Sequence, residues 1–115
     1  MIKEKELINQ IADILEEEKA DDITILDVSD VTIIADCFII ASGRSVIHVK
    51  SIAEKIEKKM RDQGIIPNRK EGQRENKWVV LDFSSVILHI LRYEEREYYE
   101  LENLWGDAKE IYVKH

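Results

Sequence analysis

Two short apolar runs separated by a pair of serines constrain this chain more than any other feature. Residues 78–82 read WVVLD and have the aromatic and β-branched content of a strand. Ser84-Ser85 supplies turn chemistry, and residues 86–91, VILHIL, are short enough for a strand that is buried on both faces. The sequence therefore predicts a β-hairpin over residues 78–91.

The pattern changes after residue 91, where the strand-like runs end. Tyr98, Leu101 and Trp105 recur at helical spacing, so a short helical segment is expected to follow the hairpin. Residues 78–105 also contain both tryptophans and three of the four tyrosines, together with many acids. An aromatic and acidic patch beside a rigid sheet favours recognition of another protein, while the alternative is that these rings fill the core.

The rest of the chain shows helical and strand patterns in turn. Two amphipathic helices are predicted, with apolar stripes formed by Leu7, Ile8, Ile11, Ile14 and Leu15 in the first and Val49, Ile52, Ala53, Ile56 and Met60 in the second. Strands are predicted over residues 23–28 and 36–42, and the second belongs in the middle of the sheet because its centre is apolar on both faces. Residues 65–67 are expected to form a short edge strand, residues 70–77 a polar connector, and residues 108–113 either a last strand or a surface segment.

Length and pattern together predict the fold class. A chain of 115 residues fits one domain and can bury enough surface to need no cross-link. We therefore expect a single α/β (α+β) domain over residues 1–115, in which helices pack on a mixed sheet of about five strands.

Composition limits the cellular location. Cys37 is the only cysteine in the sequence, so no intrachain disulfide can form, and this fits a reducing compartment. Residues 1–6 are charged and hold no apolar core of signal length, and no run approaches the roughly 18 apolar residues of a membrane span. A cytoplasmic protein without a membrane partner is expected.

Charge is distributed unevenly along the chain, whose net charge is −7. Residues 78–115 hold eight acids and four bases, and this acidic third favours a basic protein as partner. Residues 44–77 hold ten bases and five acids, so this basic third, including the helical stretch 55–61, is a candidate for peripheral contact with RNA phosphates. The alternative for both thirds is an ordinary solvated surface.

The histidines do not form a metal site by spacing. His48, His89 and His115 are far apart in the sequence and have no cysteine at ligand spacing. His89 shares a strand face with Ile87 and Leu91, which favours a hydrogen-bonded core or interface histidine over a catalytic one.

Other reactive groups also give weak signals. Cys37 falls inside an apolar strand, where a thiol usually serves as inert packing. The acidic pairs at residues 95 and 97 and at 100 and 102 point apart on a helix, which argues against a metal. No enzymatic activity and no cofactor are therefore predicted. The alternative is a nucleotidyltransferase-like enzyme or nucleotide-binding protein that uses the turn at Ser42 and Gly43, although further glycines of the known phosphate motifs are missing.

Several short motifs occur in a fixed order between residues 23 and 108. They are Asp27-Val28, DCFIIASG over residues 36–43, Glu71-Gly72, WVVLD over 78–82, VILH over 86–89, REYYELENLW over 96–105 and Asp107-Ala108. Through these motifs the chain resembles the ribosomal silencing factor family, also called Iojap-like proteins. No single motif is diagnostic, but their combination in this order is specific.

The resemblance implies a fold similar to that of nucleotidyltransferases, without catalysis. It also implies binding to the large ribosomal subunit through its fourteenth protein, a basic protein on the face that meets the small subunit. Occupying this face would block joining of the subunits and lower translation when nutrients are scarce. Free members of the family can be homodimers, so a weak homodimer is expected here.

The resemblance also implies a contact surface. Carried over by position, this surface comprises Trp78, Leu81, Asp82, Arg96, Tyr99, Glu102 and Trp105. Alternation along the strand places Leu81 on the face opposite Trp78 and Asp82. The chain departs from the family at Ser84-Ser85, where many members have Gly-Asp, so no binding role is carried over to this turn.

Overall fold

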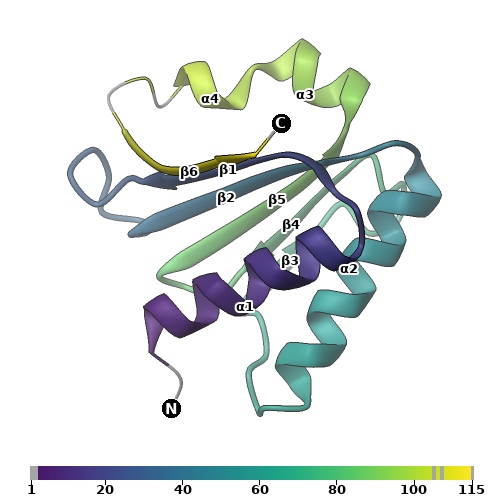
Figure 1. The fold of residues 1–115 in the computed structure, drawn as a ribbon, viewed down its shortest axis with the longest axis horizontal. Helices are drawn as coiled ribbons and strands as arrows, with labels where there is room; N and C mark the ends of the chain where they lie inside the picture. The colour runs from purple at the N-terminus through teal and green to yellow at the C-terminus, as the bar shows by residue number, and fades with distance from the viewer. Residues whose placement is uncertain (1–2, 105, 107, 115) are drawn as a thin grey trace.

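A mixed sheet with helices on both faces organises residues 3–104, 106 and 108–114, which the computed structural model describes (Figure 1). The helices are α1 (Glu4–Glu17), α2 (Val46–Arg61), α3 (Tyr93–Tyr99) and α4 (Leu101–Leu104). The strands are β1 (Asp21–Asp27), β2 (Cys37–Gly43), β3 (Arg69–Glu71), β4 (Trp78–Asp82), β5 (Val86–Arg92) and β6 (Lys109–Lys114). The order across the sheet is β3-β4-β5-β2-β1-β6, in which β2 and β5 run parallel and the other neighbours antiparallel. The predicted α/β fold is confirmed, with a sixth strand beyond the five expected.

The long helices α1 and α2 cover one face of the sheet (Figure 1). Both predicted stripes are confirmed, because the buried residues are Leu7, Ile11, Ile14 and Leu15 in α1 and Val49, Ile52, Ala53, Ile56 and Met60 in α2. Each fully buried isoleucine or leucine stabilises the fold by roughly 1.5–3 kcal/mol relative to an exposed one. This layer supplies the larger of the two apolar cores in the described chain.

Strand β2 is buried along its whole length, which confirms its predicted place in the middle of the sheet. Its side chains alternate, so that Cys37 and Ile39 face α1 and α2 while Phe38 and Ile40 face the other side. Burial raises the pKa of the Cys37 thiol to about 12. The thiol therefore stays protonated at neutral pH and serves as packing, as the sequence predicts.

The edge strands differ from the prediction. The strand that precedes the hairpin is β3, Arg69–Glu71, rather than residues 65–67, so it occupies the start of the expected polar connector. Its side chains are all exposed, and it therefore carries no apolar period by which a strand could be recognised. Residues 108–113 are expected from the sequence to form either a last strand or a surface segment. They form most of β6, which pairs with β1 at the other edge, so the strand is confirmed.

The hairpin has the predicted turn. Strands β4 and β5 are antiparallel, and the backbone N–H of Phe83 donates to the carbonyl of Val86 at 2.9 Å. Ser84 adopts a φ of 75°, in the left-handed region that favours glycine. The side chain of Asp82 stabilises this turn by accepting the Ser84 N–H at 2.8 Å.

The segment after the hairpin is helical, but it consists of two short helices. Glu100 adopts a left-handed φ of 48° and separates α3 from α4. As a result Tyr98 is 75% exposed, whereas Leu101 is 6% exposed and packs against the sheet. The single stripe predicted for Tyr98, Leu101 and Trp105 is therefore wrong for its first two members, and Trp105 lies outside the described residues.

We expect Gly72→Ala to destabilise the protein more than the same change at Gly64. Both glycines have positive φ, 83° and 79°, so each alanine would cost about 1 kcal/mol in backbone strain. A Cβ at residue 72 would also lie 1.8 Å from the carbonyl oxygen of Trp78, whereas one at residue 64 would meet open space. Overpacking of this kind adds about 1–3 kcal/mol.

Urea unfolding of the two variants tests this prediction. We expect the free energy of unfolding to fall by about 3 kcal/mol for Gly72→Ala and by about 1 kcal/mol for Gly64→Ala. Equal losses would contradict the close approach of residue 72 to the start of β4.

Candidate functional site

The face of the sheet opposite α1 and α2 holds a second apolar cluster. Its buried members are Leu26, Val28, Ala35, Phe38, Ile40, Ile87, Leu91 and Leu101, and the half-buried Trp78, Val80 and Ala108 pack against them. The short helices α3 and α4 lie on this side (Figure 1). They leave part of the face accessible around β4 and β5, where Trp78, Val80 and His89 are half-buried.

A row of rings crosses this accessible face, and we call it the aromatic row. Phe38 contacts His89 edge-on with ring centroids 5.5 Å apart, and His89 lies 6.0 Å from Trp78. Trp78 in turn contacts Tyr99 at 4.9 Å, and Tyr99 contacts Tyr98 at 4.9 Å. The row therefore runs from the buried centre of the sheet at Phe38 to the solvent-exposed end of α3, and it combines rigid rings with accessible surface.

An apolar recess lies beside the aromatic row. It has a volume of about 280 Å³ and is lined by Ile34, Phe38, Ile40, Arg69, Glu71, Trp78, Val80, Ile87, His89 and Leu101. Sites for small molecules usually occupy about 300–1,000 Å³, so this recess suits a side chain better than a cofactor. The loop between β1 and β2 extends the apolar surface, because Ile34 is 62% exposed and Ile33 is fully exposed.

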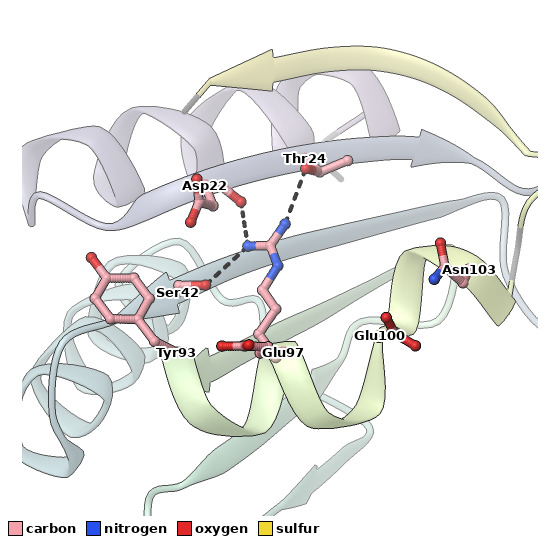
Figure 2. Close-up of a pocket in the computed structure, with 8 residues that line it drawn as sticks. Asp22, Thr24, Ser42, Tyr93, Glu97, Glu100 and Asn103 are labelled. Atoms are coloured by element: carbon pink, nitrogen blue, oxygen red, sulfur yellow. Dashed lines mark hydrogen bonds between the residues drawn. The ribbon is translucent and has the colours of Figure 1, made fainter.

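Arg96 fastens α3 to strands β1 and β2 of the sheet (Figure 2). Its guanidinium donates to the hydroxyls of Ser42 and Thr24, each at 3.1 Å, and to the backbone carbonyl of Asp22. Both hydroxyls are buried, so Arg96 satisfies polar groups that would otherwise be costly inside the fold. These bonds fix the helix that carries Tyr99.

The beginning of α3 is fixed by charged groups. Arg92 donates from Nε and Nη2 to the two carboxylate oxygens of Glu95, at 2.7 and 2.8 Å. This hydrogen-bonded pair lowers the pKa of Glu95. The hydroxyl of Tyr93 donates to the carboxylate of Asp21, and this bond raises the pKa of Tyr93. The helix is therefore tied to the sheet at its first turn as well as at Arg96.

A hollow of about 540 Å³ surrounds the Arg96 side chain (Figure 2). It is lined by Asp22, Thr24, Ser42, Tyr93, Arg96, Glu97, Glu100 and Asn103. Its outer residues Glu97 and Glu100 are exposed and acidic. The aromatic row is therefore bordered along α3 by negative charge, as the acidic composition of this third predicts.

The predicted contact residues fall into different environments. Trp78 and Tyr99 lie together in the aromatic row, and Tyr99 is 51% exposed. Asp82 shares their face of the sheet but stands half-buried at the turn end of β4. Arg96 points inward, so its clearest role is to position α3.

Of the other three predicted contact residues, one is buried and the structure does not describe the side chains of the other two. Leu81 is fully buried among the side chains under α1 and α2, so its contact role is not compatible with this structure. Its side chain points to the opposite face because successive strand residues alternate. Glu102 belongs to α4, but the structure does not describe its side chain, and Trp105 lies outside the described residues.

The structure identifies the partner of one predicted residue and adds two residues to the site. His89, predicted as a hydrogen-bonded histidine, accepts the Trp78 indole N–H on Nδ1 at 3.1 Å. Phe38 and Ile34 line the recess beside it. The hairpin register could have predicted the contact between His89 and Trp78, since Val80 pairs with His89 and Trp78 is its diagonal neighbour.

The turn at Ser42 and Gly43 is occupied by contacts within the chain. The Ser42 hydroxyl accepts from Arg96, and the backbone N–H of Arg44 donates to Nδ1 of His48 at 3.0 Å. Ser45 caps α2 by accepting the His48 N–H at 3.1 Å. Groups that would hold a phosphate are thus already engaged, which weighs against the nucleotide-binding alternative.

Neither a metal-binding cluster nor a membrane-spanning helix is found among the residues that the structure describes. In that part of the chain, no group of three or more His, Cys, Asp or Glu side chains is placed to hold a metal ion. Among the same residues, no helix combines the length and the apolar character required to cross a membrane.

We expect Arg96→Met to lower the free energy of unfolding by about 1–3 kcal/mol, because it leaves the buried Ser42 and Thr24 hydroxyls without their donor. Arg96→Lys should restore only part of the loss, since one ammonium cannot reproduce the planar donor array. Arg44→Met is the control. Arg44 is exposed, and its ion pair with Asp21 is long, at 3.8 Å, so its loss should change stability little. Chemical denaturation measures all three, and a loss at Arg44 as large as that at Arg96 would contradict the proposed anchoring.

The sequence was compared with protein families and with individual proteins. A family described as "Ribosomal silencing factor during starvation" matches residues 2–115. Proteins named ribosomal silencing factor RsfS from Bacillus subtilis and from Halalkalibacterium halodurans are each 36% identical over 107 residues. These alignments cover 93% of this chain, 91% of the Bacillus subtilis protein and 92% of the other.

The fold was compared with solved structures. A crystal structure of a protein from Chromobacterium violaceum superposes with a TM-score of 0.87 at 31% sequence identity. The match covers 91% of this chain and 88% of that one. The agreement of family, relatives and fold extends over nearly the whole sequence, and the chain therefore belongs to the family of ribosomal silencing factors.

Proposed function

We propose that this protein binds the large ribosomal subunit and sterically blocks its association with the small subunit, so that translation falls when nutrients are limited. The family assignment supports a ribosome-associated silencing role. The observation that carries the proposal is the accessible aromatic row beside an apolar recess on a rigid sheet. The partner on the subunit is its fourteenth protein, and the binding takes place in the cytoplasm.

The chemistry of the surface fits a protein partner. Aromatic anchors in partly enclosed surroundings provide most of the energy in many protein interfaces, and Trp78 and Tyr99 have this arrangement. The exposed acids Glu97 and Glu100 border them, so a basic protein would approach favourably. A steric mechanism requires only a stable complex on the correct face of the subunit, without a catalytic group.

A peripheral contact with ribosomal RNA is part of the proposal, and it is assigned to the connector before β4. Much of the basic charge on α2 faces acids, because Lys55 and Lys59 line one groove together with Asp13, Glu17 and Glu18 of the α1 region. Lys70 is likewise paired with Glu57 at 3.0 Å. Arg74 and Lys77 are exposed in the connector before Trp78, which supports a role for them in contacting phosphates beside a bound protein.

Self-association of the free protein is also proposed. The exposed rings of Tyr98 and Tyr99 and the exposed Ile33 and Ile34 make an apolar surface that a second copy would cover. Such a dimer would be weak, because the same surface must become available to the ribosome.

We expect the protein to sediment with isolated large subunits and not with small subunits or joined ribosomes. Adding it to a mixture of both subunits should reduce the fraction of joined ribosomes, since the complex occupies the joining face. Sucrose-gradient sedimentation measures both effects. Protein that stays at the top of the gradient with every species would refute the proposed function.

We expect Tyr99→Ala to weaken binding to the large subunit by about 2 kcal/mol, the scale of an interface hot spot, which is about thirtyfold in affinity. Its melting temperature should change little, because Tyr99 is half exposed in a short helix. The control is Ile47→Ala, which removes an exposed apolar side chain from α2 on the opposite layer. Binding that is unaffected by Tyr99→Ala, or equally affected by Ile47→Ala, would refute the site.

A further inference from the structure

Trp78 contacts the rings of His89 and Tyr99, but ring contacts alone do not determine its orientation. Tyr99 lies 4.9 Å from the indole, tilted by 48°, and restricts the plane in which the indole lies. Rotation of the indole by half a turn about its attachment would keep a ring in that plane while moving the N–H to the other side. A second contact is therefore needed to select one of the two orientations.

His89 supplies this contact from the neighbouring strand. Its Nδ1 lies 3.1 Å from the Trp78 indole nitrogen, and the geometry is that of an N–H donor and an unprotonated ring acceptor. The imidazole is itself held by Phe38, whose ring meets it edge-on at 5.5 Å. The acceptor is thus fixed by the centre of the sheet and not by a mobile loop.

The protonation state of His89 agrees with this role. Burial lowers the pKa of His89 to about 4, so the imidazole is neutral at physiological pH. A neutral imidazole keeps one nitrogen free to accept, whereas an imidazolium has donors on both nitrogens.

We propose that His89 is a positioning residue that selects the orientation of the Trp78 indole and so presets one wall of the apolar recess for the partner. The proposal deepens the function proposed above, since the recess is part of the same binding surface. Without His89 the indole samples both orientations, and a partner that fits one of them binds a smaller fraction of the protein.

The test uses three variants of the full chain. His89→Phe keeps a planar ring and removes the acceptor, while His89→Asn keeps an acceptor near the position of Nδ1. His48→Phe is the matched control, because the Nδ1 of His48 also accepts a hydrogen bond, from the Arg44 N–H, but outside this surface. Circular dichroism and thermal melting establish that each variant is folded.

The first readout needs no partner. Proton–nitrogen NMR resolves the indole N–H of Trp78, assigned with Trp78→Phe, and Trp105 gives a reference signal from the same molecule. We expect the Trp78 signal to be shifted and protected from exchange in the wild type and in His48→Phe. His89→Phe should lose this protection, and His89→Asn should restore most of it.

The second readout is affinity for isolated large subunits. We expect His89→Phe to weaken binding about fivefold, the effect of one neutral hydrogen bond together with divided populations, and His89→Asn to recover most of this loss. In a Trp78→Phe background, His89→Phe should have no further effect, because its action passes through the indole.

Several results would overturn the proposal. They are a protected Trp78 indole in His89→Phe, wild-type affinity of that variant, and an undiminished effect in the Trp78→Phe background. If His89→Phe does not fold, His89→Leu takes its place in the same comparison. Wild-type protein that fails to bind large subunits would refute the proposed function instead, and the NMR readout would still decide whether His89 orients Trp78.

Discussion

The parallel pairing of β2 with β5 is the constraint on which the rest of the structure depends. It sets Ile40 beside His89, and β4 then sets Val80 on the other side of the same histidine. Because side chains alternate strictly along a strand, a slip of one residue in β5 would move His89 under α1 and α2 and bring Leu88 to the accessible face. The buried isoleucines on both sides of β2 make such a slip costly, and the register of the proposed binding surface is therefore set by the core.

Much of this arrangement could be predicted from sequence because it rests on repeated apolar patterns. The stripes of α1 and α2 and the fully apolar β2 follow periods that burial enforces. Strand β3 could not be predicted, since its three exposed polar residues pair through their backbone alone. The break between α3 and α4 also had no signal, because Glu100 adopts a left-handed backbone that usually calls for glycine or asparagine.

The candidate site could likewise be predicted from the sequence only in part. Its tryptophan and tyrosines could be predicted to lie close together, since residues 78–105 concentrate them near one hairpin. The direction in which a long side chain points could not be predicted from the sequence, as Arg96 illustrates. Its sequence neighbours Glu95 and Glu97 are acidic, yet its guanidinium reaches the hydroxyls of Ser42 and Thr24, which are distant in sequence. A charged residue predicted to contact a partner can thus act mainly by holding the helix that carries the other predicted contact residues.

The absence of any loop between β5 and α3 has a consequence for how the surface meets a partner. The strand ends at Arg92 and the helix starts at Tyr93, so the helix continues directly from a strand locked in the sheet. The backbone of this helix therefore has little conformational entropy left to lose, and recognition through the proposed surface would be close to the docking of two preformed bodies. Complex formation would then be limited by how often the two surfaces collide in the right orientation and not by folding of a segment, which suits the proposed competition with the small subunit for the large one.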